Sequence, residues 1–277
     1  MHTSNLLNWL SSVFIMTALS SSGFADKPLI ITIDSDKTSY SKEDMLKHPE
    51  LVTLKQVQLP SYPNQVFDLQ AIPLCSLLKP PAKHEGELLK IRTFDNYLAH
   101  IKLERIYPCN KNRPATAWIA IEEPGKPWPI IPKLHRSAGE YYLIWQGEPV
   151  TQTDWIFGTT AIELTTQTPF SKFLPFMKTS QEIQGLEQFS NKCGTCHSIN
   201  LAGNLEKGPD MNYPMNPLEY FSEQQLRRFI RNPQSMRYMK NDLMFPFTTA
   251  ILSEQELDAI IAFLKAMQSH KITGHRT

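Results

Sequence analysis

The sequence predicts an α+β protein of two domains, in which a β-rich N-terminal domain precedes an all-α C-terminal domain. Between residues 28 and 165, short runs of β-branched, aromatic and leucine residues are separated by turns that contain Pro and Asn, which is typical of strands. Beyond residue 180, apolar residues recur every three or four positions, which is the period of a helix. A stretch rich in Thr and Pro, 166–179, lies between the two patterns and is predicted to be a linker. We therefore expect domains at 26–165 and 180–270.

The expected elements follow from these patterns. Strands are predicted at 29–33, 51–59, 66–72, 88–93, 98–106, 118–121, 141–145 and 156–164. Short helices are expected to begin at Ser41 and Pro73. In the C-terminal half, one helix leads toward Cys193, a second covers 222–231, and a third begins at a capping box. That box consists of Ser253 and Glu256, and the buried stripe after it is expected to consist of Leu257, Ile260, Ile261, Phe263 and Leu264.

Residues 1–25 have the features of a signal peptide. Residues 9–19 form an apolar run that is too short to span a bilayer, and small residues, Gly23 and Ala25, occupy the positions that determine cleavage. We expect cleavage before Asp26 and export to the periplasm. The segment before residue 9 contains no Lys or Arg, which signal peptides usually have, so an uncleaved N-terminal anchor is the alternative. Membrane association is expected only in that case.

Composition excludes some classes of partner and leaves one question about cysteines. Lys plus Arg is 28 and Asp plus Glu is 27, for a net charge of +1, which gives no indication of nucleic-acid binding. The apolar content of 41% is sufficient for packed cores. Two of the four cysteines, Cys75 and Cys109, lie outside any motif. In an oxidising compartment they form either a disulfide or two separate buried thiols, and the sequence leaves both open.

The run Cys193-Gly194-Thr195-Cys196-His197 indicates a cofactor. Two thiols three positions apart can each add to a vinyl group of haem, and the histidine directly after the second thiol is placed to ligate the iron. A zinc site needs a second pair of ligands, and the sequence contains no second Cys-x-x-Cys. In a redox dithiol site the two cysteines lie at the start of a helix that follows a strand, whereas this motif comes at the end of a helical pattern. We therefore predict one covalently attached haem c on Cys193, Cys196 and His197.

The C-terminal half resembles the monohaem class I cytochromes c. The resemblance rests on Gly185 and Phe189 in the helix before the motif and on Gly208-Pro209 after it. It implies that the carbonyl of Pro209 accepts the second imidazole N–H of His197, and that a methionine is the other axial ligand. Met244 is the preferred candidate, with Met236 and Met239 as alternatives. In the family a proline follows this methionine directly, whereas here Phe245 intervenes.

The N-terminal half resembles part of the sulfite-oxidase-type molybdopterin-binding fold. The similar segments are a Pro-Leu-x-x-Leu-Leu helix at 72–78 and a strand with its turn at 91–97. In catalytic members a cysteine upstream of that helix binds molybdenum, but here Cys75 lies inside the helix motif. The resemblance thus implies a relative of the fold without its cofactor, serving as a docking module. A divergent small-ligand binder is the alternative.

Together these observations predict a periplasmic c-type cytochrome that carries single electrons through a haem ligated by His197 and Met244. The expected partner is a redox protein, either a dehydrogenase or an oxidase. We expect an electron-transfer protein rather than an enzyme. The alternative is a cytochrome subunit or fused redox enzyme whose N-terminal domain holds a substrate or cofactor.

Overall fold

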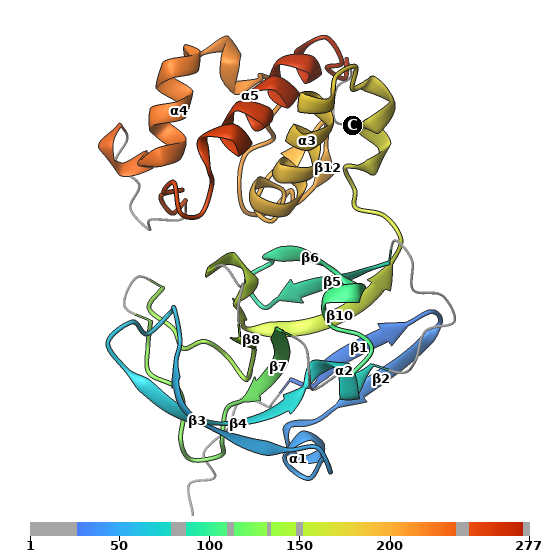
Figure 1. The fold of residues 1–277 in the computed structure, drawn as a ribbon, viewed down its shortest axis with the longest axis vertical. Coiled ribbons are helices and arrows are strands. Elements are labelled where there is room, and N and C mark those ends of the chain that lie inside the picture. The colour runs from blue at the N-terminus through green and yellow to red at the C-terminus, as the bar shows by residue number, and fades with distance from the viewer. Residues whose placement is uncertain are drawn as a thin grey trace, which may run out of the picture.

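The computed structural model describes residues 27–78, 87–109, 114–131, 134–147, 152–236 and 244–273. A β-rich region up to residue 165 is followed by a helical region, as expected from the sequence (Figure 1). The predicted signal peptide, 1–25, lies outside the described residues. Among the helices that are described, none has the length and apolar character needed to cross a membrane.

The first sheet of the β-rich region has the strand order β2-β1-β10-β5-β6. Its strands are β1 (Leu29–Ile33), β2 (Asp36–Tyr40), β5 (Leu88–Thr93), β6 (Leu98–Lys102) and β10 (Thr159–Thr165). β1 and β10 are parallel, and every other neighbouring pair is antiparallel. β10 is the central strand of this sheet and also the last strand of the region in the sequence.

The second sheet is antiparallel throughout, with the order β3-β4-β7-β8-β9. Its strands are β3 (Val52–Gln58), β4 (Val66–Pro73), β7 (Ala115–Ile121), β8 (Tyr141–Gly147) and β9 (Ile156–Phe157). The short helices α1 (Lys42–Leu46) and α2 (Leu74–Leu77) begin after Ser41 and Pro73, as predicted. The described part of this region also contains two 3-10 turns, η1 (Leu103–Arg105) and η2 (Gln152–Asp154).

Two hydrophobic cores cover the two faces of the second sheet. Leu143 of β8 belongs to the core that also holds Ile31 and Ile91 of the first sheet. Its neighbours Tyr142 and Ile144 belong to the other core. Because successive side chains of a strand point to opposite faces, β8 is buried on both sides, which explains its almost continuous apolar sequence.

The predicted strands all occur, with three differences. The strand predicted at 98–106 ends at Lys102 and continues as η1, and the strand predicted at 156–164 is divided by Gly158. Gly158 has a φ of +66°, which a residue with a side chain rarely adopts. The sequence analysis did not identify β2. Its residues, DKTSY, are polar and mostly exposed, because β2 is an edge strand that contributes little to either core.

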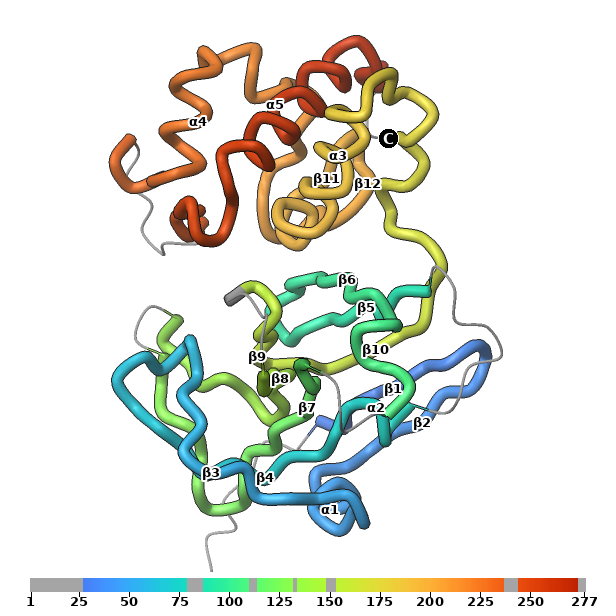
Figure 2. The backbone as a smooth tube through the Cα atoms, viewed as in Figure 1, coloured from blue at the N-terminus to red at the C-terminus, as the bar shows by residue number. Residues whose placement is uncertain are grey.

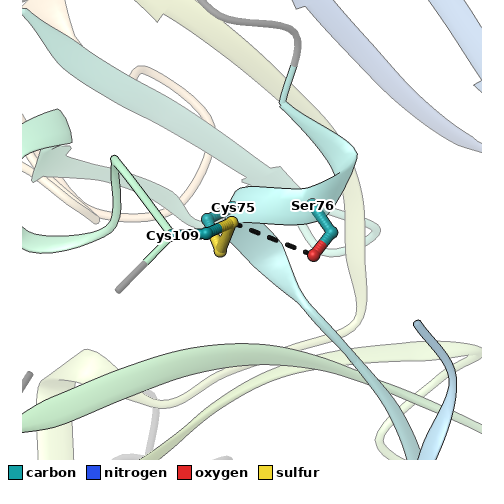
Figure 3. Close-up of a disulfide and its surroundings, with 3 residues drawn as sticks. All are labelled: Cys75, Ser76 and Cys109. Carbon is teal, nitrogen blue, oxygen red and sulfur yellow. Dashed lines mark hydrogen bonds between the residues drawn. A yellow bond between two sulfur atoms is a disulfide. The ribbon is translucent and has the colours of Figure 1, made fainter. Parts of the chain in front are cut away.

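A disulfide joins Cys75 of α2 to Cys109, with an S–S distance of 2.04 Å (Figure 3). The hydroxyl of Ser76 lies 3.9 Å from the Cys109 sulfur. The bridge joins residues 34 positions apart, one in the helix and the other in the segment after η1. Of the two alternatives left open by the sequence, the structure contains the bridge.

The helical region contains three longer helices. They are α3 (Ser180–Gln188), α4 (Glu223–Arg231) and α5 (Glu254–Gln268). Each begins with a capping box, formed by Thr179, Ser222 and Ser253 with the side chain three residues later. The shorter elements are η3 (Ser171–Phe176), the π-helical turn η4 (Phe189–Cys193), β11 (Ser198–Ile199), β12 (Ala202–Gly203), η5 (Pro217–Glu219) and η6 (Pro233–Ser235). The predicted stripe of α5 is buried along its whole length.

The segment expected to be a linker, 166–179, contributes to the helical core. Phe170 and Phe173 are 1% and 3% exposed and belong to the same hydrophobic cluster as α5. The Phe170 ring packs edge-on against Phe189, with centroids 5.4 Å apart. Gly194 leaves room for it, since a Cβ there would stand 2.3 Å from the ring. The core of the helical region therefore begins upstream of α3.

Candidate haem site

The Cys-x-x-Cys-His motif closes the helix that contains α3 and η4. The backbone N–H groups of Cys196 and His197 both donate to the carbonyl of Cys193, at 3.0 and 2.9 Å. Side chains three and four positions apart in such a turn lie on the same side of it. The two thiols and the imidazole are thus presented together, which is the arrangement needed to bind one planar group by three points.

Both motif cysteines are free thiols. Burial, with a smaller contribution from the nearby Cys196, raises the pKa of Cys193 to about 12. Burial also raises the pKa of Cys196, which the ammonium group of Lys207 partly offsets. Neither thiol therefore ionises near neutral pH in the absence of a ligand. Protonated, partly buried thiols in an apolar setting are chemically quiet until a reactive vinyl group is brought to them.

The imidazole of His197 is oriented by the loop that follows it. Its Nδ1 lies 2.8 Å from the carbonyl oxygen of Pro209. A carbonyl only accepts, so Nδ1 carries the proton and Nε2 presents a lone pair. Burial lowers the pKa of His197, which keeps the ring neutral and able to ligate a metal. Gly208 makes the approach possible, because a Cβ there would stand 2.5 Å from Nδ1.

The carboxylate of Asp210 holds this loop in place through hydrogen bonds. It accepts hydrogen bonds from the backbone N–H groups of Asn200, Leu201, Asn212 and Tyr213 and from the hydroxyl of Ser198, at 2.7–3.0 Å. The five donors come from both sides of the loop, so one side chain holds the turn after the motif against the segment that carries Pro209. The sequence analysis did not single out Asp210.

Three buried asparagines connect the same loop to the end of α5. Asn216 donates to the side-chain oxygen of Asn212, and Asn212 donates to that of Asn200, both at 2.9 Å. Each amide also donates to a carbonyl in or just after α5, namely Leu264, Met267 and His270. Asn212 and Asn216 are 0% exposed. Buried amides that are fully paired in this way specify one arrangement of the segments they join. We refer to Asn200, Asn212 and Asn216 as the asparagine ladder.

The helix before the motif packs closely against α5. Gly185 faces Ala259, and the ring of Phe189 packs against Phe263 with centroids 5.3 Å apart. Gly185 and Phe189, on which the resemblance to class I cytochromes c rests, thus both lie in this contact. Lys192 adds a polar link, since its ammonium group donates to the carbonyl of Ile251 at 2.7 Å and to Glu256 at 3.0 Å.

Met244 lies on a separate loop that is anchored to α4 and α5. Its side chain is partly buried and packs against the helical core. Three residues later, Phe247 donates its N–H to the carbonyl of Ile230 at 3.1 Å, and its own carbonyl accepts from Arg231 at 2.8 Å. Arg231 also donates to the carbonyl of Leu252 at 2.5 Å. Of the alternative ligands, Met236 follows η6, and Met239 lies outside the described residues.

The β-rich region contacts the loop next to the motif, through the turn between β5 and β6 (Figure 2). Lys207 donates to the carboxylate of Asp95 at 2.7 Å. The amide of Asn204 donates to the carbonyl of Asn96 at 2.5 Å and to that of Thr195, inside the motif, at 2.9 Å. The N–H of Leu98 also donates to Thr195, at 3.2 Å. Asn96 has a φ of +63°, which asparagine tolerates.

The residues present fit a covalently bound haem c. Two free thiols and a neutral imidazole project from one helical turn, the imidazole has its tautomer fixed, and Gly208 leaves no side chain in the space beside the ring. The structure brings Cys193, Cys196, His197 and Pro209 together, and it places Met244 on a distinct loop of the same region. Asp210, the asparagine ladder and the Asp95–Lys207 pair were not identified from the sequence. Only the unusual number of Asn and Asp residues after the motif could have indicated them.

Comparison with known proteins agrees with this description for the helical region. Residues 183–268 match the family described as cytochrome c. This part of the chain is a cytochrome c domain, and the family binds haem covalently and transfers electrons. The match does not reach the β-rich region. No curated protein and no solved structure matches the chain significantly.

Proposed function

We propose that the protein is a periplasmic cytochrome that carries single electrons through one covalently bound haem c. The observation that supports this most directly is the hydrogen bond between His197 Nδ1 and the Pro209 carbonyl, within the region that matches the cytochrome c family. A bond of this kind orients a histidine for metal ligation and raises its basicity. A zinc site would need a second pair of ligands, which the sequence lacks, so the bond favours ligation of a haem iron here.

In this proposal each site residue has a separate role. Cys193 and Cys196 would hold the haem through thioether bonds, and His197 and Met244 would ligate its iron. The haem, when bound, supplies an iron that alternates between Fe(III) and Fe(II). The protein excludes water from it with the core formed by Phe170, Phe189, Leu226 and Phe263.

The β-rich domain is proposed to serve as a docking module for a dehydrogenase or an oxidase. Its β5–β6 turn already contacts the loop that carries Lys207, so a partner that binds this domain is held near the haem. The resemblance to the molybdopterin-binding fold remains a proposal about its ancestry, and it implies no cofactor here because no cysteine lies upstream of the Pro73 helix.

The test is covalent attachment in the exported, full-length protein. Haem should stay with the chain on a denaturing gel and stain for peroxidase activity, and Cys193→Ala/Cys196→Ala should abolish the stain. Haem that extracts from the unmodified protein into acidic organic solvent would contradict the proposal. Metal analysis of the same preparation distinguishes the electron carrier from the alternative, a fused redox enzyme. Iron alone agrees with the carrier, whereas stoichiometric molybdenum indicates the enzyme.

A further inference from the structure

A cavity lies where the β-rich region faces the helical region. Its volume is about 190 Å³. The β-rich region provides most of the lining, and the residues on which the argument depends are Ser61, Asp95, Tyr142, Trp155 and Phe157. The helical region provides Lys207 and Phe245. The cavity therefore belongs to neither region alone.

The two residues from the helical region place this cavity beside the haem site. Lys207 directly precedes Gly208-Pro209, the loop that orients His197. Phe245 directly follows Met244. A molecule in the cavity would thus touch both chain segments that hold the candidate axial ligands. None of the motif residues lines the cavity, although its lining residue Lys207 is close enough to Cys196 to offset part of the rise that burial causes in the pKa of that thiol.

The aromatic wall of the cavity is preorganised. The ring of Tyr142 makes edge contacts with Trp155 and Phe157, with centroids 6.5 and 6.1 Å apart. Its hydroxyl is held 2.9 Å from that of Ser61. Tyr142 is 1% exposed, so it mainly holds in place the partly exposed rings of Trp155 and Phe157, which offer the cavity a rigid apolar surface. The hydroxyl of Ser61, which also lines the cavity, can bond a polar substituent of a ligand.

Phe245 adds a further aromatic ring to the lining, from the helical region. It is 40% exposed and stacks on Phe247, with centroids 4.5 Å apart. It is also the residue that separates Met244 from Pro246, where the resemblance to class I cytochromes predicts a proline next to the methionine. The position at which the chain departs from that pattern is therefore the position that faces the cavity.

We propose that this cavity binds a small planar aromatic molecule that carries a hydroxyl group, such as a phenol or a hydroquinone. The size fits one ring with substituents, because a dry cavity of about 150 Å³ holds benzene. The aromatic lining favours a planar ring over a saturated one. The Ser61–Tyr142 hydroxyl pair and the Asp95–Lys207 pair, which also line the cavity, fit a phenolic O–H. The binding itself does not depend on haem. That the bound molecule delivers electrons to the haem rests on the proposed function.

The test is calorimetric titration of the oxidised, full-length holoprotein with phenol, and with cyclohexanol as a saturated control of the same size. Phenol should bind at least about tenfold more tightly than cyclohexanol. Phe245→Ala and Trp155→Ala should each weaken phenol binding about tenfold, and Ser61→Phe, which places a ring in the cavity, should abolish it. The control is Tyr220→Ala, which removes an exposed aromatic outside the cavity and should leave binding unchanged.

The outcomes separate this inference from the proposed function. Absence of phenol binding, equal binding of cyclohexanol, or unchanged binding in both Phe245→Ala and Ser61→Phe overturns the inference, even if the same preparation carries covalent haem. Loss of binding in the cavity variants but not in Tyr220→Ala supports it. The haem content, measured from the spectrum of each variant in alkaline pyridine, tests the proposed function independently of the titration.

Discussion

Gly185 of α3 and Ala259 of α5 are in backbone contact: a Cβ at residue 185 would stand 1.9 Å from the carbonyl oxygen of Ala259 and 2.8 Å from the Cβ of Phe263. Neither neighbour can move without shifting α5 itself. Since α5 also receives the asparagine ladder and Lys192, this crossing sets the position of the haem motif relative to the rest of the helical region.

Gly185→Ala should therefore destabilise the holoprotein, although alanine is the better helix former. Forcing a methyl group into a packed contact costs about 1–3 kcal/mol of unfolding free energy. Thermal or denaturant unfolding followed at a haem absorption band measures this. Gln184→Ala, at an exposed position of the same helix, is the control and should change stability little. Equal stability of the two variants would show that the helices can separate at no cost.

Gly208→Ala should raise the reduction potential of the haem. The added Cβ would stand 2.5 Å from the His197 ring, so the loop must move and the hydrogen bond to Pro209 is lost. An imidazole without this bond donates less electron density, which favours Fe(II). A potentiometric titration measures the shift. Pro209→Ala keeps the carbonyl and should stay close to wild type; a matching rise in that variant would mean that the bond is not the cause.

Met244→Ala should abolish the weak near-infrared sulfur-to-iron band of the oxidised protein and lower its reduction potential. The physical reason is that the thioether favours Fe(II), whereas water or an oxygen ligand favours Fe(III). Near-infrared absorption and potentiometry give the two readouts. Met236→Ala and Met239→Ala serve as matched controls, and loss of the band in one of these instead would transfer the ligand role to it.

The ion pair between Asp95 and Lys207 should make the free energy of unfolding depend on pH in the acidic range. Burial raises the pKa of Asp95, but the hydrogen bonds from Lys207 and Thr93 outweigh burial, and the net pKa lies below the ordinary 3.8. A folded pKa below the unfolded one contributes stability that is present above pH 3.8 and is lost as pH falls through the folded pKa.

The unfolding free energy of wild type should thus exceed that of Asp95→Asn at about pH 6, and the difference should shrink toward about pH 2. Denaturant unfolding at both values measures it. A difference that stays constant across this range would indicate a steric effect of the amide rather than the loss of a charged partner.

The helical region should depend on the segment before α3. A fragment comprising residues 166–277, exported and matured, should hold haem, whereas one comprising residues 178–277 should be less stable because it lacks Phe170 and Phe173. Removing one buried Phe side chain alone costs about 3–5 kcal/mol. Haem retention and thermal unfolding of the two fragments test this, with Phe170→Ala in the full chain as the matched variant. Equal haem retention and equal unfolding temperatures would show that the segment is only a linker after all.

The sequence analysis identified most of the elements because their signals are local. Strands with buried faces, capping boxes and the stripe of α5 each depend on residues within one segment. The edge strand β2 was missed because exposure removes the apolar signal, and 166–179 was expected to be a linker because its Phe residues find partners only in the helical core that follows.

The candidate site shows the same limit. The thiols, His197 and Pro209 follow from spacing along the chain. Asp210 and the asparagine ladder act across loops, and each of their partners is set by the tertiary fold. The Asp95–Lys207 pair joins residues 112 positions apart, which no local pattern encodes.

The parallel pairing of β1 with β10 has a consequence for how the chain acquires its structure. β10 lies between β1 and β5, so until residues 159–165 join, the first sheet consists of two unconnected hairpins. Contacts that span so much of the chain form slowly. The Cys-x-x-Cys-His segment follows about thirty residues later. We expect the thiols to be accessible for haem attachment before the first sheet has closed, and the β5–β6 turn to contact Thr195 and Lys207 only afterwards.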